Sequence, residues 1–326
     1  MGGGLKPAIR NWINTLIGLA ALIAAGFFLF KRVQALNRAE VADYLRSLEG
    51  MRLAIIVLWT MISYLILTVY DLLSLRFLKK RIPYRQVALA AFVGYSISKN
   101  LGISWLTGGS MRYRFYSRWG LALKDVSKLV LFNTTTFLCG FFFWGGFSFF
   151  FSPFKEELTA GVPSEMRPWI GVLLWGMLLL YFGVCSRSRK TFTFWGRTWH
   201  LPSLSIALSQ WLLGTADVFV TLWILFLILP PAAVSLGAFL AAYFMAEVVA
   251  ILTHAPGGIG VFESTLLMLL DGRLSEAVLL SSLLLYRVIY FLIPLVLGIA
   301  LLAVDEVRYR PGKSLEAMLH QKTGNG

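Results

Sequence analysis

The chain has 326 residues, of which 58% are hydrophobic and only 14% are charged, and its mean hydropathy is +0.72. This composition excludes an ordinary soluble domain and is typical of a polytopic membrane protein. The formal net charge of +14 does not indicate nucleic-acid binding, because the basic residues lie between apolar runs and form no nucleic-acid motif.

Eight apolar runs follow one another along the chain, and most are long enough for one helical crossing of a bilayer. They lie at 13–30, 53–75, 87–106, 130–151, 169–185, 204–229, 236–270 and 278–304. The first run is longer than the apolar part of a typical signal peptide, so we expect a retained span. Residues 33–48 place apolar side chains at helical spacing, which predicts an amphipathic helix along the membrane surface.

The runs at 87–106 and 236–270 differ from the others because polar residues and a Gly-Gly pair interrupt or follow them. If both enter and return on the same side, the positive-inside rule puts most Lys and Arg residues in the cytoplasm. The acid-containing loops at 40–49, 156–165 and 271–276 then lie outside. The sequence therefore predicts an all-α fold with six full spans and two re-entrant hairpins.

This topology makes the second half of the chain an inverted copy of the first, as in many secondary transporters. We expect a single integral membrane domain over 1–326, with pseudo-repeats at about 11–152 and 169–304 and both termini in the cytoplasm. The alternative is that there is no inverted repeat and that the two glycine-rich kinks resemble each other by coincidence. Both readings predict a polar site, because irregular backbone at membrane depth must be buried in protein or line a wet cavity.

The first kink is followed by basic residues that could bind a lipid phosphate. Arg112, Arg114 and Arg118 come after Gly108 and Gly109, and aromatic residues alternate with them. Arginine binds phosphate through paired hydrogen bonds, and aromatic side chains favour the headgroup level. A headgroup clamp at the cytoplasmic mouth is one hypothesis, and an ordinary basic membrane anchor is the other.

Lys99 and Asn100 precede this kink. Lys99 could bind a lipid phosphate, pair with Glu247 or extend to the inner surface. Asn100 is expected to satisfy backbone groups that the kink sets free.

The second kink contains His254, Pro256, Gly257, Gly258 and Glu263. Proline and glycine break the helix and free backbone N–H and C=O groups that can face a ligand. His254 and Glu263 could exchange a proton or bind an amine-bearing headgroup. A zinc site is not expected, because it needs a third ligand close by.

Asp71, Asp217, Glu247 and Arg287 are further charged residues inside apolar runs. Such residues are costly at membrane depth and need partners. Arg287 is expected to pair with Asp71, Asp217 or Glu263, and both a structural ion pair and a proton relay stay open for each acid.

No catalytic motif is present, so we expect neither an enzyme nor a cofactor. Cys139 and Cys185 both lie in apolar runs and indicate small packing residues rather than a metal pair.

Four stretches resemble the transmembrane region of the lysylphosphatidylglycerol synthetase/flippase family. They are YDLL at 70–73, TGGSMRYRFYSRWGL at 107–121, HAPGGIGVFE at 254–263 and LLYRVIYFLIPL at 284–295. The length and short loops look like the stand-alone YbhN type rather than full MprF, so we do not expect synthesis of lysylphosphatidylglycerol. Glu247 and Asp217 fall outside these motifs.

The resemblance implies a bacterial inner-membrane protein that moves an anionic or aminoacylated phospholipid between leaflets. The implied partners are phosphatidylglycerol-type lipids or cardiolipin, a lipid-synthesis enzyme and a second copy of the chain. The alternative is a non-transporting scaffold or regulator of a lipid-synthesising or envelope enzyme, in which Arg112→Ala and Glu263→Ala would leave function intact. A membrane-embedded enzyme acting on a polyprenyl carrier lacks catalytic residues and comes last.

Overall fold

The computed structural model describes residues 38–101, 104–150, 163–187, 191–194, 197–253 and 258–323. The expected first span at 13–30 lies outside the described residues, and so do His254, Pro256 and Gly257 of the second kink.

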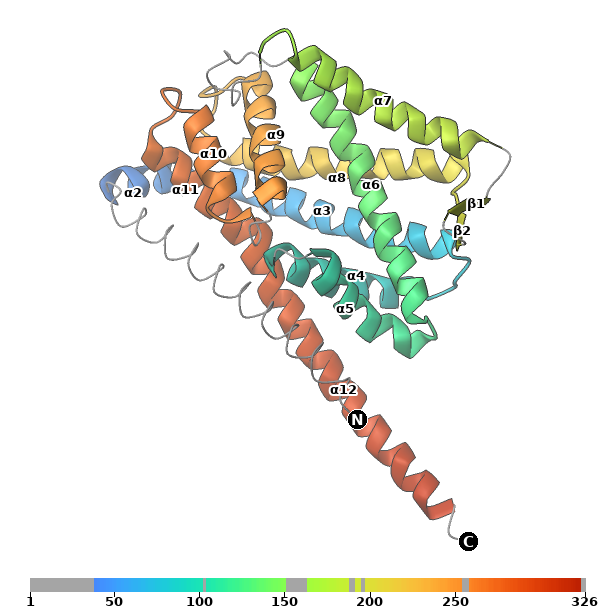
Figure 1. Ribbon diagram of the computed structural model, residues 1–326. Helices are drawn as coiled ribbons and strands as arrows, with labels where there is room; N and C mark the ends of the chain where they lie inside the picture. Colours follow the sequence, from blue (N-terminus) through green and yellow to red (C-terminus); the bar gives the residue numbers. More distant parts are fainter. Residues whose placement is uncertain are drawn as a thin grey trace, which may run out of the picture.

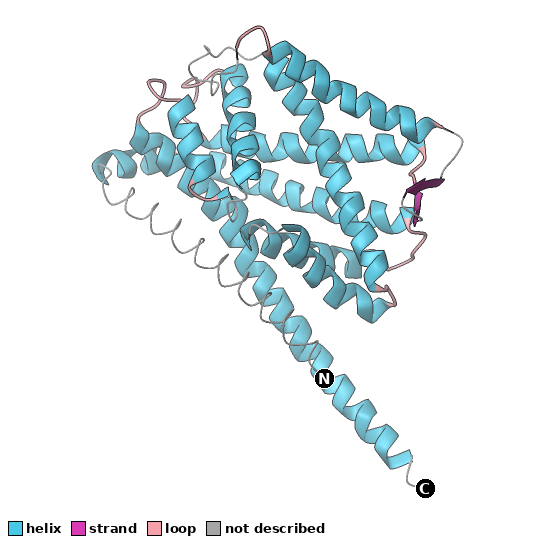
Figure 2. Cartoon of the chain, viewed as in Figure 1, coloured by secondary structure: helices cyan, strands magenta, loops and turns pink. Residues whose placement is uncertain are grey.

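The described chain is a bundle of helices, with one short β-hairpin at its edge (Figures 1 and 2). The helices are α2 (Arg38–Ser47), α3 (Gly50–Phe77), α4 (Tyr84–Leu101), α5 (Ser104–Tyr116), the 3-10 helix η1 (Ser117–Trp119), α6 (Leu123–Phe150), α7 (Arg167–Ser186), α8 (Leu204–Ile228), α9 (Leu236–Thr253), α10 (Val261–Leu269), α11 (Glu276–Tyr286), the π-helix η4 (Arg287–Leu292) and α12 (Ile293–Thr323). Strands β1 (Thr191–Phe194) and β2 (Arg197–His200) pair antiparallel between α7 and α8. The predicted all-α class is confirmed, and the hairpin is a small addition to it.

Six helical stretches among the described residues are long and apolar enough to cross a membrane. They are Gly50–Phe77, Leu123–Phe150, Arg167–Ser186, Leu204–Ile228, Leu236–Thr253 and Glu276–Arg308. Five of them coincide with spans expected from the sequence, and the remaining one is α9, which the sequence placed in a hairpin.

Each of the two interrupted runs forms a pair of helices that pack against each other, α4 with α5 and α9 with α10. Re-entry from opposite faces and the inverted repeat stay predictions. The first break was placed wrongly, because Gly108 and Gly109 lie inside α5 rather than in a turn. In the second kink, Gly258 and Gly260 have φ of +65° and +84°, so this turn does need glycine.

Helix α8 is central because α3 and α6 both pack along it (Figure 1). The crossing of α6 and α8 depends on Gly140 and Gly214. A Cβ atom at Gly140 would overlap the carbonyl of Gly214, and one at Gly214 would overlap the carbonyl of Thr136. Small residues at such crossings allow the close backbone approach that packs membrane helices.

Helix α2 is tied to the bundle at the carboxyl end of α8. Tyr44 of α2 donates its hydroxyl to the carbonyl of Ile228 over 2.7 Å. Arg52, at the start of α3, donates to the neighbouring carbonyls of Leu227 and Leu229. These carbonyls lack partners within the helix, so the side chains complete its end. Burial raises the pKa of the Tyr44 phenol, which keeps this donor protonated. The amphipathic helix predicted at 33–48 is therefore a packing element over its described part.

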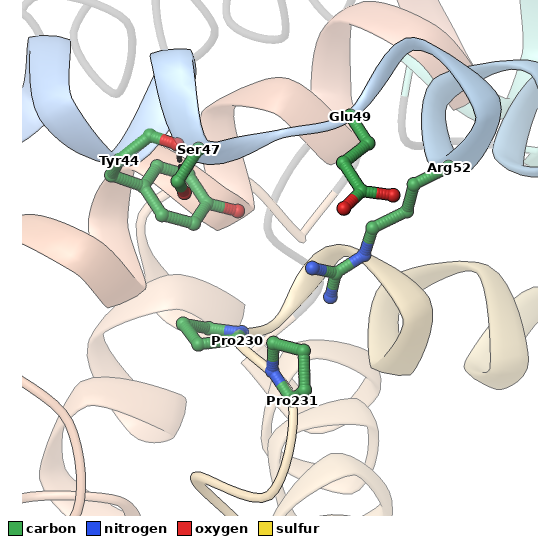
Figure 3. A pocket seen from close by; sticks show the side chains of 6 residues that line it. All are labelled: Tyr44, Ser47, Glu49, Arg52, Pro230 and Pro231. Atoms are coloured by element: carbon green, nitrogen blue, oxygen red, sulfur yellow. Dashed lines mark hydrogen bonds between the residues drawn. The ribbon is translucent and has the colours of Figure 1, made fainter.

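An open pocket of about 310 Å³ lies beside this junction. Figure 3 shows it between α2, the start of α3 and the turn after α8. Its lining residues are Tyr44, Ser47, Glu49, Arg52, Pro230 and Pro231.

Candidate functional site

Polar side chains gather in groups inside the bundle. The first group surrounds Asp71 of α3, which is fully buried. Arg112 donates its Nε to both carboxylate oxygens, over 3.2 and 3.0 Å. Asn133 donates to Oδ1 over 2.6 Å, and Tyr116 donates to Oδ2 over 2.8 Å. The carboxylate is therefore fully hydrogen-bonded.

Arg112 is not a freely exposed phosphate ligand, because only 3% of its surface is accessible and Asp71 holds it. Its guanidinium carbon lies 4.1 Å from the ring centre of Tyr95. The Nη2 atom has no hydrogen-bond partner among the described residues, so one donor remains to be satisfied.

Two glycines make room for this arginine. A Cβ atom at Gly108 would lie 3.0 Å from Nη1 of Arg112, and one at Gly94 would lie 3.5 Å from its Cγ. Gly108 also faces Ser98 of α4 at 3.2 Å. Gly108 therefore serves close packing of α5 against α4, whereas Gly109 faces Val130 of α6.

The second group is built on Tyr290 of η4. Lys99 donates its Nζ to the Tyr290 hydroxyl, and Nζ lies 4.4 and 5.6 Å from the ring centres of Tyr290 and Tyr64. The same hydroxyl lies 2.9 Å from Ser63 Oγ and 2.9 Å from Thr221 Oγ1. The prediction that Lys99 could extend to the inner surface is wrong, because its Nζ points into the bundle.

Lys99 makes no ion pair with any carboxylate of the described chain. Asp217 and Glu247 are the acids near enough to interact with its charge. Glu247 accepts a hydrogen bond from Tyr243 over 3.1 Å. The ammonium is thus held by an aromatic hydroxyl and two ring faces rather than neutralised in direct contact.

Asp217 of α8 is buried, with 5% of its surface accessible. Its Oδ2 accepts a hydrogen bond from Tyr70 over 3.2 Å. Within the described part of the chain its Oδ1 has no partner.

The π-helix η4 has a visible cause in the sequence. Pro294 has no N–H, so the carbonyl of Tyr290, four residues earlier, loses its α-helical donor. Tyr64 donates to this carbonyl over 3.2 Å, and Asn100 donates to the next one, Phe291, over 3.3 Å. Asn100 also donates to the carbonyl of Ser96 in its own helix over 2.8 Å, so the backbone groups that it contacts lie in α4 and η4 rather than at the first kink.

A third group joins the second kink to η4. Arg287 donates its Nε to Glu263 Oε1 over 2.7 Å, and its Nη2 lies 2.7 Å from the same oxygen. Glu263 Oε2 accepts the backbone N–H of Gly260 over 2.7 Å. Of the three acids left open for Arg287, the structure selects Glu263, and the pair anchors the start of α10.

The two remaining basic site candidates, Arg114 and Arg118, lie at one end of the bundle. Arg114 pairs with Glu306, and Arg118 pairs with Asp305 over 2.6 Å and with Glu306 over 3.8 Å. These contacts tie α5 and η1 to α12, which runs out beyond them (Figure 1). Clamp and anchor hypotheses both stay open for these arginines.

Sequence reasoning missed the hydroxyl and amide groups that complete these clusters. They are Ser63, Tyr64, Tyr70, Tyr95, Tyr116, Asn133, Thr221, Tyr243 and Tyr290. Two signals were available: Asn133 interrupts an apolar run, and Tyr116 follows Arg112 by four residues, which places both on one helix face.

Comparisons with known proteins agree with this architecture. The Lysylphosphatidylglycerol synthase TM region profile matches residues 15–298. Uncharacterized protein slr0712 of Synechocystis is 31% identical over 259 residues, covering 78% of this chain and 80% of the relative. Inner membrane protein YbhN of Escherichia coli is 30% identical over 271 residues, covering 80% and 82%.

A more distant relative is the Phosphatidylglycerol lysyltransferase of Staphylococcus xylosus. It is 19% identical over 303 residues, which cover 91% of this chain but 34% of that protein. The profile spans most of the chain, and the apolar helices fit it. The protein is therefore a membrane protein of the lysylphosphatidylglycerol synthase transmembrane-region family.

Proposed function

We propose that the protein moves phospholipid headgroups, anionic or aminoacylated, across the membrane through the polar centre of its bundle. The observation that carries this proposal is Lys99, a cation inside an apolar bundle that no described carboxylate neutralises in direct contact. Burying such a charge is costly, and ionisable residues at membrane depth usually mark a substrate or ion pathway. A lipid phosphate is the anion that a membrane supplies in quantity.

Two donors would hold the phosphate in this mechanism. Lys99 offers its ammonium, and Arg112 offers the Nη2 atom that has no described partner. Asp71 keeps Arg112 in place, and Tyr95 supports its guanidinium face. Arg287 and Glu263 act as a structural strut, because each already satisfies the other.

The ion pairs at the end of the bundle would act as a gate. An arriving phosphate competes with Asp305 and Glu306 for Arg114 and Arg118, because all three are oxyanions. Releasing α12 from α5 would open the route toward Lys99. The bacterial inner membrane is the proposed location, in line with the YbhN relative and its printed name.

A liposome assay tests the proposal. The full chain is reconstituted with phosphatidylglycerol carrying a fluorescent acyl chain, and a membrane-impermeant reductant reports lipid in the outer leaflet over time. We expect faster transbilayer movement than in protein-free vesicles. Lys99→Met should slow it about 10- to 100-fold, because a hydrogen bond to a charged group contributes about 1.5–3 kcal/mol.

Lys124→Met, at an exposed position of α6, is the matched control and should leave the rate unchanged. Rates equal to those of empty vesicles would contradict the proposal and favour the non-transporting scaffold. A Lys99→Met rate equal to wild type would exclude this lysine from the lipid path.

A further inference from the structure

Asp217 differs from the buried acids Asp71 and Glu263 in having no cationic partner in contact. Asp71 is paired with Arg112, and Glu263 is paired with Arg287. Asp217 lies midway along the candidate span α8 and makes no ion pair within the described residues. A charged carboxylate at this depth costs about 2.5–3.5 kcal/mol on insertion scales, so its protonated form is accessible there.

The titratable groups that face Asp217 come from three neighbouring helices. They are Tyr64 and Tyr70 on α3, Tyr95 and Lys99 on α4, and Tyr290 on η4. Behind Lys99 lies Glu247 of α9. Among these groups, Lys99 is the one cation that interacts with the Asp217 carboxylate, and the two make no ion pair.

Hydroxyl groups lie close to both Lys99 and Asp217. The ammonium donates to the Tyr290 hydroxyl, which lies 2.9 Å from Ser63 Oγ. The Ser63 side chain also interacts with the Asp217 carboxylate. The ammonium and the carboxylate therefore influence each other without direct contact.

We propose that lipid translocation is coupled to protons and that Asp217 is the group that carries them. Without lipid, the Lys99 ammonium balances the Asp217 carboxylate. When a phosphate binds Lys99, two anions face one cation, and the carboxylate takes one proton from water to become a neutral carboxylic acid. Departure of the phosphate restores the carboxylate, and the proton leaves on the same side. One proton therefore accompanies each anionic headgroup, and the step moves no net charge.

This inference rests on the proposed function, and the same vesicles test it separately. A pH difference of one unit is imposed across vesicles containing the fluorescent phosphatidylglycerol, and valinomycin with equal potassium removes any membrane potential. We expect the lipid to accumulate in the leaflet facing the alkaline side, up to about tenfold, because one pH unit is a tenfold ratio of protons.

Asp217→Asn keeps the shape of the side chain but cannot carry a proton. We expect this variant to move lipid without a gradient and to leave both leaflets equally labelled when the gradient is imposed. Glu49→Gln, an exposed acid beside the pocket of Figure 3, is the matched control and should respond as wild type does.

Equal labelling in the wild type despite lipid movement would overturn the coupling and leave translocation standing. A wild-type leaflet ratio in Asp217→Asn would also overturn it. An absence of any lipid movement would instead reject the proposed function and the coupling with it.

A second measurement uses wild-type protein alone, in case Asp217→Asn does not fold. Purified protein in weakly buffered detergent receives phosphatidylglycerol, and a pH dye follows the solution. Uptake of about one proton per bound lipid is expected from linkage, and no uptake would overturn the coupling.

Discussion

Asp71 illustrates how single residues make charge tolerable inside this bundle. Three side chains from two other helices donate to its carboxylate: Arg112 and Tyr116 from α5, and Asn133 from α6. A buried charge is stable only when its desolvation is offset by such contacts. The Asp71–Arg112 pair therefore holds α3 and α5 together, in addition to being part of a candidate ligand site.

We predict that Asp71→Ala lowers the free energy of unfolding by about 3–5 kcal/mol, because Arg112 would stay buried without a counter-charge. The double variant Asp71→Leu with Arg112→Met should recover most of that loss, since neither charge remains. Unfolding by added SDS, followed by tryptophan fluorescence, measures both.

Asp43→Ala is the control, because the Asp43–Arg46 pair is exposed and its loss should cost about 0–1 kcal/mol. A double variant as unstable as Asp71→Ala would show that the pair contributes more than charge compensation.

The sequence identifies Asp71, Lys99 and Arg287 as residues needing partners, because charge inside an apolar run is rare. It does not identify the partners, since Asp71 and Arg112 are far apart in sequence and meet only because α4 and α6 pack on both α3 and α5. The tyrosine hydroxyls could not be predicted for a related reason. Tyrosine is common in membrane helices, and only the fold shows which hydroxyls point inward.

At the level of elements, glycine has two different uses here. Gly258 and Gly260 permit backbone conformations with positive φ, whereas Gly140 and Gly214 permit helix contact. Sequence reading treated the Gly108 and Gly109 pair as the first kind, and the structure places it in the second. The pattern alone cannot separate them, because both uses exploit the missing side chain.

We predict that Gly214→Leu prevents α8 from packing on α6, because even a Cβ atom there would overlap the carbonyl of Thr136. The expected result is loss of the monodisperse peak in detergent size-exclusion chromatography. Gly176→Leu is the matched control, since a Cβ atom on that face of α7 meets nothing within 4 Å. A normal profile for Gly214→Leu would contradict the packing described.

The helices themselves are the part that the sequence predicts best. Uninterrupted apolar runs become α3, α7 and α8 with nearly the expected bounds, because length and hydrophobicity decide a membrane helix. The break inside the last run was not predicted as a π-helix, although Pro294 marks it. Its form depends on Tyr64 and Asn100 reaching across from other helices.

For the whole molecule, the distribution of basic residues predicts the orientation of the chain in the membrane. Arg81 and Ser117 belong to basic segments that the positive-inside rule puts in the cytoplasm, whereas Asp271 belongs to an acid-containing loop expected outside. The inverted architecture requires these two sets to face opposite compartments.

We predict that Arg81→Cys and Ser117→Cys react with an impermeant maleimide only from the cytoplasmic side, and Asp271→Cys only from the other. All three positions are exposed, and the buried Cys139 and Cys185 are replaced by Ala in the background. Labelling of Ser117→Cys and Asp271→Cys from one side would exclude the inverted repeat.

Helix α7 stands apart because it packs mainly on α6 and exposes Leu173, Leu179 and Leu180. Its 20 residues make it about 30 Å long, close to the hydrocarbon thickness of a typical bilayer, while its neighbours α6 and α8 are longer. We therefore expect a change in acyl-chain length to tilt α7 first, since it is the least buried of the six candidate spans. The thickness of the surrounding bilayer would thus act on this protein through the orientation of α7.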